Sequence, residues 1–443
     1  MRPVRWIAAL ALVAFATAPV VASGDDMSDA DMREQMQIMQ QRMKRMEDKL
    51  RDAERRAPAA PAAANDCFFC TIEFEGWISA SYMWNTEGFD DHVNGQDLGG
   101  FNAGVVPAYP FRPDHNSFSV DQVWMGMERA ISADQRAGFR LDFVFGKTAD
   151  LLNGAGPFPG PEDGFSGSAE DFHMYQAYIQ YLAPLGEGVE FKFGKFGTLI
   201  GAEVVQSPQN YNVTRSNLYN LFQPITHTGI MATASFWEGG TTSLGLANET
   251  RSFPSRDVDL NNNKAILWQV GHQFNDTLFA SFNGAFGDAD SGAGFDAPSG
   301  DKETILDVVV TWDPTDKFSG YFNFDYLKND AGNTTEGFGF ATAGRYSLTE
   351  KMGLAGRVEW LQLGSDGIDS DDIQLFGLTG TLDYLLTQNL MVRGEVRWDQ
   401  RTGGDIGNLF FESGGATRGV PGGGQEVSKQ NQVVIGAEVI YTF

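Results

Sequence analysis

The sequence repeats one pattern along most of its length: apolar and polar residues alternate over stretches of about ten residues. In 139–145, phenylalanine and leucine hold the odd positions, whereas Arg140 and Asp142 share the opposite face. In 433–443, every odd position is apolar or aromatic. Because side chains on a β-strand point alternately to its two faces, this period predicts strands with one apolar face and one polar face.

About sixteen such strands are expected, and the connections between them alternate in length. Short connections include 348–349 and 387–388, and long ones include 86–115, 147–170 and 401–427. Short turns at one end and long loops at the other are typical of outer-membrane barrels. The sequence therefore predicts an all-β fold, a transmembrane antiparallel β-barrel with both ends of the barrel chain on the periplasmic side. The expected strands are 72–85, 116–131, 135–146, 171–183, 188–199, 225–236, 240–250, 263–274, 277–287, 302–313, 317–328, 334–347, 350–361, 372–386, 389–400 and 428–443.

Charged residues in the middle of these strands indicate which face is wet. A charge on the lipid face of a barrel costs a few kcal/mol, whereas in a water-filled lumen it costs little. A soluble barrel would instead place its apolar side chains inside. Because a barrel of this strand number is wide enough to hold water, we expect apolar faces against outer-membrane lipid and a polar pore.

The N-terminal segment has the features of a secretory signal peptide. Arg2 and Arg5 precede an apolar core, and small residues follow at 21–23. The alternative is a transmembrane anchor, which would need a longer apolar core. We expect residues 1–23 to be the signal peptide and residues 71–443 the transmembrane β-barrel domain, in a bacterial outer membrane.

Residues 24–56 are predicted to form a periplasmic helix. Apolar residues, mostly methionine, recur in steps of three and four from Met32 to Ala53, which is the seam of a coiled coil. The main interpretation is a stalk that joins three copies of the chain into a homotrimer. A helix packed on the mouth of the barrel and a contact with the cell wall are the alternatives.

Residues 57–70 form a linker rich in alanine and proline, and it carries Cys67 and Cys70, the only two cysteines. An exported chain enters an oxidising compartment, so the pair is a candidate for a local or interchain disulfide. A metal or redox role and no role are the alternatives. Thr71 stands where a c-type haem site would need histidine, and a single CxxC is weak as a metal site. We therefore expect no cofactor and no metal.

The stretch 200–224 is the third long loop by strand order, and its composition is unusual for an exposed tip. It mixes amide and hydroxyl side chains with apolar residues that are able to pack. We therefore expect it to fold into the lumen and to narrow the pore. Glu203, Tyr211 and Arg215 are the candidate constriction residues, and the alternative is an ordinary surface loop with a short helix.

A set of charged residues lies on the predicted lumenal faces of the strands. Arginines that face acids across a lumen create a transverse field that orients a dipolar solute. Alternatively, the same residues pair with one another as a structural ladder. The candidate pore-lining residues are Arg140, Asp142, Arg357, Glu359, Arg393, Glu395 and Arg397.

Composition and motifs argue against two classes of function. The chain has 58 Asp and Glu against 32 Lys and Arg, whereas nucleic-acid binding needs a basic surface. The five histidines are scattered, and none has metal-ligand spacing or lies in a nucleophile motif. We expect His227 to hydrogen-bond within the barrel wall, and we expect no enzyme activity.

Several segments resemble the OmpL-like β-barrel porins of the bacterial outer membrane. The resemblance implies passive passage of solutes, so the expected function is a water-filled channel for small hydrophilic solutes or ions. A tether to the cell wall and a barrel sheath for an electron-transfer partner are the alternatives. The helical extension is similar to that of trimeric porins. The segments are GWI at 76–78, SY at 81–82, AGFRLD at 137–142, QAY at 176–178, GKFGT at 194–198, GAEVV at 201–205 and PITHTG at 224–229.

The last predicted strand is expected to close against the first near Trp77. Its aromatic residues Tyr441 and Phe443 then lie at the membrane interface. We expect them to form the signal by which the barrel assembly machinery recognises the chain. The expected partners are that machinery, outer-membrane lipid, small hydrophilic solutes and further copies of the chain.

Overall fold

The structure is a computed structural model, and the part of the chain that it describes falls almost entirely within the predicted barrel domain. The predicted signal peptide, the helix at 24–56 and most of the linker at 57–70 lie outside the described residues. Within the described part, no helix is long and apolar enough to cross a membrane. The described residues are 68–86, 92–93, 96–97, 111, 116–152, 172–250, 263–288, 302–330, 335–365, 372–402 and 431–443.

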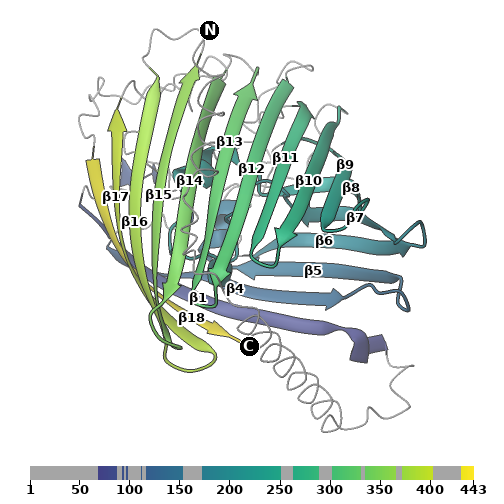
Figure 1. The fold of residues 1–443 in the computed structure, drawn as a ribbon. Coiled ribbons are helices and arrows are strands. Elements are labelled where there is room, and N and C mark those ends of the chain that lie inside the picture. Colours follow the sequence, from purple (N-terminus) through teal and green to yellow (C-terminus); the bar gives the residue numbers. More distant parts are fainter. Residues whose placement is uncertain are drawn as a thin grey trace, which may run out of the picture. The chain divides into compact units, whose positions relative to one another are not determined.

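Sixteen antiparallel strands close into one barrel (Figure 1). Each of the sixteen predicted strands is present, so the fold class and the strand number are confirmed. The barrel strands are β1 (Glu73–Asn85), β4 (Ser117–Arg129), β5 (Ala137–Phe145), β6 (Phe172–Ala183), β7 (Val189–Gly197), β8 (Thr226–Ala234), β9 (Gly240–Ala247), β10 (Ala265–Asn275), β11 (Leu278–Asp288), β12 (Lys302–Thr315), β13 (Phe318–Asn329), β14 (Thr335–Ser347), β15 (Met352–Ser365), β16 (Ile373–Leu385), β17 (Leu390–Thr402) and β18 (Asn431–Thr442).

The barrel closes where β1 pairs with β18. Trp77 lies opposite Thr442, as predicted. The backbones of Gly76 and Phe443 exchange two hydrogen bonds, with N–O distances of 3.0 and 2.9 Å. Because closure pairs the first strand with the last, neither is left as an open edge, which a lipid-exposed sheet could not tolerate.

The strand faces alternate as the sequence predicts. On β18, Val439 and Tyr441 are 45% and 47% exposed, whereas Glu438 and Ile440 are each 1% exposed. On β12, Asp307 is fully buried and Trp312 is 46% exposed. The exposed apolar residues thus form the outer surface of the barrel, and the charged residues point inward.

Several short elements lie outside the sixteen predicted strands, and each is too short to show a period in the sequence. They lie in the long loops or ahead of β1. The elements are the 3-10 helices η2 (Phe68–Thr71) and η3 (Ser207–Gln209), the paired strands β2 (His92–Val93) and β3 (Gln96–Asp97), and the helices α3 (Lys147–Leu152) and α4 (Asn217–Phe222).

Besides the buried pair Met83 and Val434, the described residues include two large apolar clusters inside the barrel, so its interior is not wholly polar. Each joins residues of the long loops to inward-facing residues of the wall. The first apolar cluster contains Phe196, Ile200, Leu218, Phe222, Met231, Ala247, Leu267, Ala285, Ile305, Leu327, Ala341, Leu361, Leu363, Ile373 and Leu375. The second apolar cluster contains Trp77, Phe111, Trp124, Val144, Ala149, Leu151, Leu152, Tyr175, Val205, Tyr219, Ile225 and Ile440.

Candidate functional site: the loop inside the lumen

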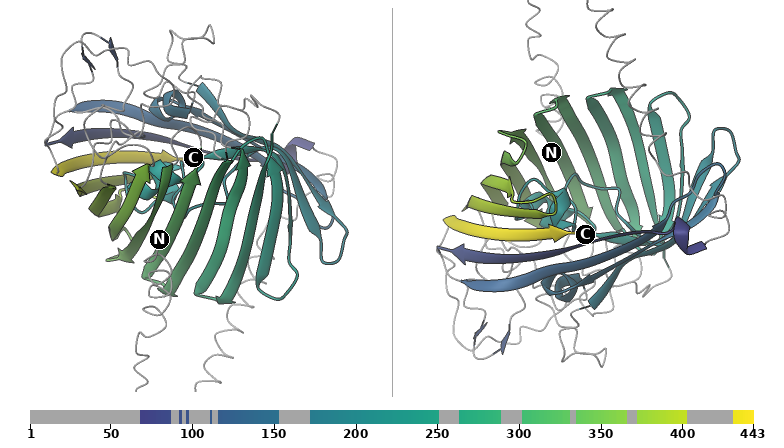
Figure 2. Two further views of the ribbon diagram at one scale, coloured as in Figure 1. Left: turned by 90° about the horizontal axis from the view of Figure 1, so that it is seen from above. Right: turned by 90° about the horizontal axis from the view of Figure 1, so that it is seen from below.

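The connection between β7 and β8, residues 198–225, folds into the barrel. Its helix α4 lies within the ring of strands in both end views (Figure 2). Every residue from 212 to 219 is buried. We call residues 198–225 the inward loop. Its hydrogen bonds reach inward-facing residues on six strands, namely Gln122, Asp307, Asn323, Arg357, Thr381 and Glu395.

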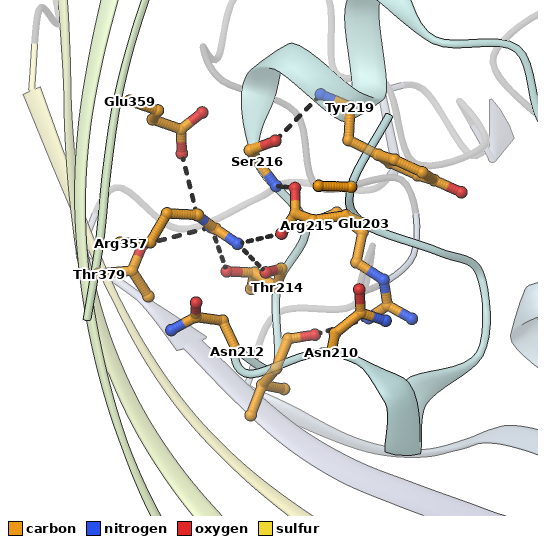
Figure 3. Close-up of polar contacts among 12 residues, drawn as sticks. Glu203, Asn210, Asn212, Thr214, Arg215, Ser216, Tyr219, Arg357, Glu359 and Thr379 are labelled. Atoms are coloured by element: carbon orange, nitrogen blue, oxygen red, sulfur yellow. Dashed lines mark hydrogen bonds and ion pairs between the residues drawn. The ribbon is translucent and has the colours of Figure 1, made fainter. Parts of the chain in front are cut away.

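An ion pair between Glu203 and Arg357 joins the inward loop to β15 (Figure 3). Oε1 of Glu203 lies 2.7 Å from Nη1 of Arg357, and Oε2 accepts a hydrogen bond from the Ser216 amide at 2.8 Å. Arg357 also donates to the Thr214 carbonyl at 2.6 Å. The guanidinium therefore holds both arms of the loop at one point on the wall.

The helix α4 is fixed at its start by two oxygen acceptors. Ser216 is its N-cap, and its hydroxyl accepts from the Tyr219 amide at 3.0 Å. The Asn217 amide donates to the carboxylate of Glu359 on β15. These contacts satisfy amide groups that a helix N-terminus leaves without partners, and they place a carboxylate at the positive end of the helix.

The two faces of α4 pack on opposite sides of the lumen. Leu218 and Phe222 belong to the first apolar cluster, whereas Tyr219 belongs to the second. All three side chains are at most 4% exposed. Apolar burial of this kind stabilises the loop in the lumen by about 1.5–3 kcal/mol for each large side chain.

Arg215 shapes the loop itself, because its guanidinium donates to carbonyl groups of the loop. It donates to the carbonyls of Val204 and Val213, each at 2.9 Å, and also to that of Val205. Its guanidinium lies 5.4 Å from the centre of the Phe111 ring. The residue is 2% exposed, so it connects the two arms of the loop from within.

The charges on β17 meet the tip of the inward loop. Arg393 pairs with Glu438 and donates to the Asn210 carbonyl at 2.7 Å. Glu395 accepts from the Val213 and Thr214 amides at 2.6 and 3.0 Å. These contacts place the tip against the wall at β17 and β18.

Arg397, also on β17, links the wall charges together. Its guanidinium pairs with Glu359 and with Asp399, each at 2.9 Å. It also donates to the Arg215 carbonyl at 2.6 Å. Arg357 and Glu359 approach to 3.6 Å on β15.

The predicted pore-lining residues thus face the lumen, but the inward loop covers most of them. The side chains of Arg357 and Arg397 are 0% exposed, and that of Arg393 is 2% exposed. This arrangement matches the structural ladder, the second of the two interpretations that the sequence left open. Fully desolvated charges of this kind require the partners they have here.

Arg140 differs because its guanidinium is 17% exposed. It pairs with Glu128 at 2.8 Å and Asp142 at 2.9 Å, and it also contacts Glu75. Glu75 is 53% exposed, whereas Asp142 is fully buried. This group lies near the end of the barrel that carries the short turns.

Tyr211 is the predicted constriction residue that stays partly exposed. Its ring stacks on Tyr321 of β13, with centroids 6.0 Å apart and an angle of 17° between planes. Burial raises the pKa of the Tyr211 phenol above its ordinary value, and Asp313 acts in the same direction. The phenol therefore stays protonated and able to donate a hydrogen bond at neutral pH.

The family of the chain follows from its sequence. A family model described as "Putative beta-barrel porin-2, OmpL-like" matches residues 71–443. The chain belongs to this porin family. No curated protein matches the chain by sequence. The match covers the whole barrel, including the later half of the chain.

Solved outer-membrane proteins share the fold of this porin. An OmpT variant of Vibrio cholerae that lacks loop L8 is 10% identical with a TM-score of 0.52, and the alignment covers 84% of this chain and 99% of the other. OprB of Pseudomonas putida is 13% identical with a TM-score of 0.52, covering 84% and 94%. An anion-selective porin from Comamonas acidovorans is 13% identical with a TM-score of 0.50, covering 84% and 99%.

Some inward-facing charges of this porin lie near the short turns and remain partly exposed to solvent. Lys192 and Glu190 on β7 lie 3.4 Å apart, and their side chains are 27% and 30% exposed. On β14, Arg345 pairs with Asp383 at 2.6 Å and is 29% exposed. Charges of both signs therefore line the accessible part of the wall.

Other predicted residues have structural surroundings. His227 is buried and lies 3.0 Å from the Thr198 hydroxyl, so the predicted hydrogen bond within the wall is present. Cys70 is disulfide-bonded, whereas Cys67, the other cysteine of the sequence, lies outside the described residues. Among the described residues, no group of three or more His, Cys, Asp or Glu side chains is placed to hold a metal ion.

Proposed function

We propose that this porin forms a water-filled channel through the outer membrane for the passive diffusion of small hydrophilic solutes. The short turns then face the periplasm, and the long loops face the outside. The inward loop sets the narrowest part of the channel. The observation that carries this proposal is the buried Glu203–Arg357 ion pair, which fixes the loop across the lumen.

The three candidate constriction residues take different parts in this proposal. Glu203 and Arg215 are 6% and 2% exposed, so they hold the loop in its shape and place. Tyr211 is partly exposed and presents its ring and hydroxyl to the solute. A rigid loop defines the size of the aperture, because its position is set by bonds to six strands.

The accessible wall supports selection by size more than by charge. Lys192 and Glu190 neutralise each other, and so do Arg345 and Asp383. The arginines of β15 and β17 are paired with acidic residues and are covered by the loop. We therefore expect solutes of either sign to pass if they fit the aperture.

A liposome swelling assay tests the proposal. Purified folded protein in liposomes is exposed to a series of uncharged sugars of increasing size. We expect swelling rates that fall steadily with sugar size and reach zero at a cut-off. Heat-modified electrophoresis of the same sample shows that the barrel is folded. Folded barrels that admit none of the sugars would overturn the proposal.

A further inference from the structure

Two buried carboxyl groups are neighbours on adjacent strands inside the barrel. Asp307 on β12 and Asp325 on β13 are direct cross-strand partners. Their side chains point inward and are fully buried, and each accepts a hydrogen bond from the same Asn323 amide group. Two neighbouring carboxylates repel each other in a buried place, and a proton bound by the pair relieves that repulsion.

This pair holds the two ends of the inward loop. The Gly201 amide donates to Oδ1 of Asp307 at 2.9 Å, at the start of the loop. The Gln223 side chain, at its end, donates to Oδ2 of Asp325 at 2.7 Å. Asn323 lies between them and donates to both carboxyl groups at 3.1 and 3.0 Å.

Asn323 extends the anchor to a second amide of the loop. Its Oδ1 accepts from the Ala202 amide at 3.0 Å and from Gln223 at 2.8 Å. The start and the end of the loop are thus bonded to one small group of β12 and β13 side chains. Whatever separates the two carboxyl groups also moves these anchors.

The elements around the pair supply neutral groups rather than a counter-charge. Within the described residues, neither carboxyl group forms an ion pair. On β11, Asn283 donates to Asp307 at 3.0 Å, and on β14 the residue opposite Asp325 is Gly339. The nearby titratable groups are Glu303 on β12, which accepts from Thr250 and Asn329, Tyr321 on β13, and Glu203 of the loop, which pairs with Arg357.

We propose that Asp307 and Asp325 form a proton-binding site that latches the base of the inward loop. With one proton bound, the pair carries a single negative charge that five neighbouring N–H donations stabilise. Loss of that proton leaves two neighbouring carboxylates in a buried place, and they repel each other. The latch is therefore closed at low pH and opens as the pH rises.

Amide hydrogen exchange tests the latch without relying on channel activity. Exchange of the segment around Gly201 and Ala202 is followed by mass spectrometry from about pH 5 to about pH 9, corrected for the intrinsic pH dependence of exchange. The segment around Val213 and Thr214, which bonds to Glu395, is the internal control. We expect protection at 201–202 to fall by about tenfold or more at high pH while the control segment keeps its protection.

Variants of the two carboxyl groups sharpen the test. Asp325→Asn and Asp307→Asn each remove the shared proton, and either is expected to make protection at 201–202 independent of pH. Asp316→Asn, in the exposed turn of the same hairpin, is the matched control and should respond as the wild type does. Heat-modified electrophoresis shows which variants fold. If neither carboxyl variant folds, the pH dependence of protection in the wild type still tests the proposal.

Three results would overturn the proposal. The first is wild-type protection at 201–202 that does not change with pH. The second is loss of protection in both segments together, which would indicate general opening of the loop. The third is a response to EDTA at constant pH, which would show that the carboxyl pair holds a metal ion rather than a proton.

Discussion

Oε1 of Glu203 and Nη1 of Arg357 lie 2.7 Å apart, although the two residues are 154 positions apart in the sequence. The first lies in the inward loop, and the second lies in the middle of β15. Their side chains are 5% and 0% exposed. This buried contact fixes the inward loop across the lumen, and the size of the proposed aperture depends on it.

Removal of Arg357 should destabilise the barrel strongly. Arg357→Met leaves Glu203 and Glu359 buried without this partner, and loss of one member of such a pair costs about 3–5 kcal/mol. Denaturant titration in detergent, followed by tryptophan fluorescence, measures the free energy of unfolding. Lys328→Met is the control, because its ion pair with Asp330 is 41% and 45% exposed and should contribute less than about 1 kcal/mol.

The double variant Glu203→Gln with Arg357→Met refines this prediction. Removing both charges leaves no unpaired partner between them, so the loss should be smaller than the sum of the two single losses. Strict additivity of the two losses would contradict a direct interaction between these residues.

Gly201→Ala should disturb the base of the inward loop. Gly201 has a φ of +94°, and an added Cβ would lie 1.9 Å from Oε1 of Gln223. The strained backbone alone costs about 1–2 kcal/mol, and the clash displaces a residue that bonds to Asp325. Denaturant titration should show lower stability, and liposome swelling should admit larger sugars.

Gly380→Ala is the matched control for Gly201→Ala. Gly380 lies on β16 with open space where a Cβ would be added. Alanine is favoured over glycine inside a strand by roughly 0.5–1 kcal/mol, so this variant should be as stable as the wild type or more so. Equal losses in both variants would contradict the role given to Gly201.

Tyr211→Ala should enlarge the aperture without loosening the loop. The Tyr211 ring is partly exposed, and its contact with Tyr321 is a single stacked pair. We expect single-channel conductance to rise by roughly tens of per cent, because the diameter of a pore sets its conductance. Protection of the Val213 and Thr214 amides from hydrogen exchange should stay as in the wild type. An unchanged conductance would place Tyr211 outside the aperture.

Deletion of Phe443 should reduce assembly more than conductance. The residue exchanges two backbone hydrogen bonds with Gly76 and so completes the seam between β1 and β18. Phe443→Ala keeps these bonds and removes only the ring, which is 60% exposed. The amount of heat-modifiable barrel in outer membranes measures assembly. Normal amounts of the truncated protein would contradict the proposed assembly signal.

The fold was predictable from the sequence because two local constraints act at every strand. Lipid requires an apolar outer face, and closure requires that every backbone group finds a partner. The first constraint is visible at single residues of β12, where Asp307 faces inward and Trp312 faces outward. The place of 200–224 in the lumen was also predictable, because apolar side chains are unfavourable on a loop tip that is exposed to water.

The state of the lumenal charges was not predictable, because it depends on contacts between distant parts of the chain. The sequence places Arg357 and Arg397 on inward faces, but it does not show that the loop covers them. A signal for the covering was present in β15, where Leu361 and Leu363 share the inward face with Arg357 and Glu359. An apolar pair on a lumenal face indicates that something packs against it.

Single-channel recording in planar lipid bilayers tests whether the inward loop sets the aperture of a channel, with wild type, Arg357→Met and Lys328→Met compared in the same salt solution. We expect discrete conductance steps for all three proteins. Steps of Arg357→Met should be larger and noisier than those of the wild type, because its loop is released, and steps of Lys328→Met should equal the wild-type steps. Folded wild-type protein without conductance steps would contradict the proposed channel function. Steps of Arg357→Met identical to those of the wild type would contradict the role of the Glu203–Arg357 ion pair in fixing the aperture.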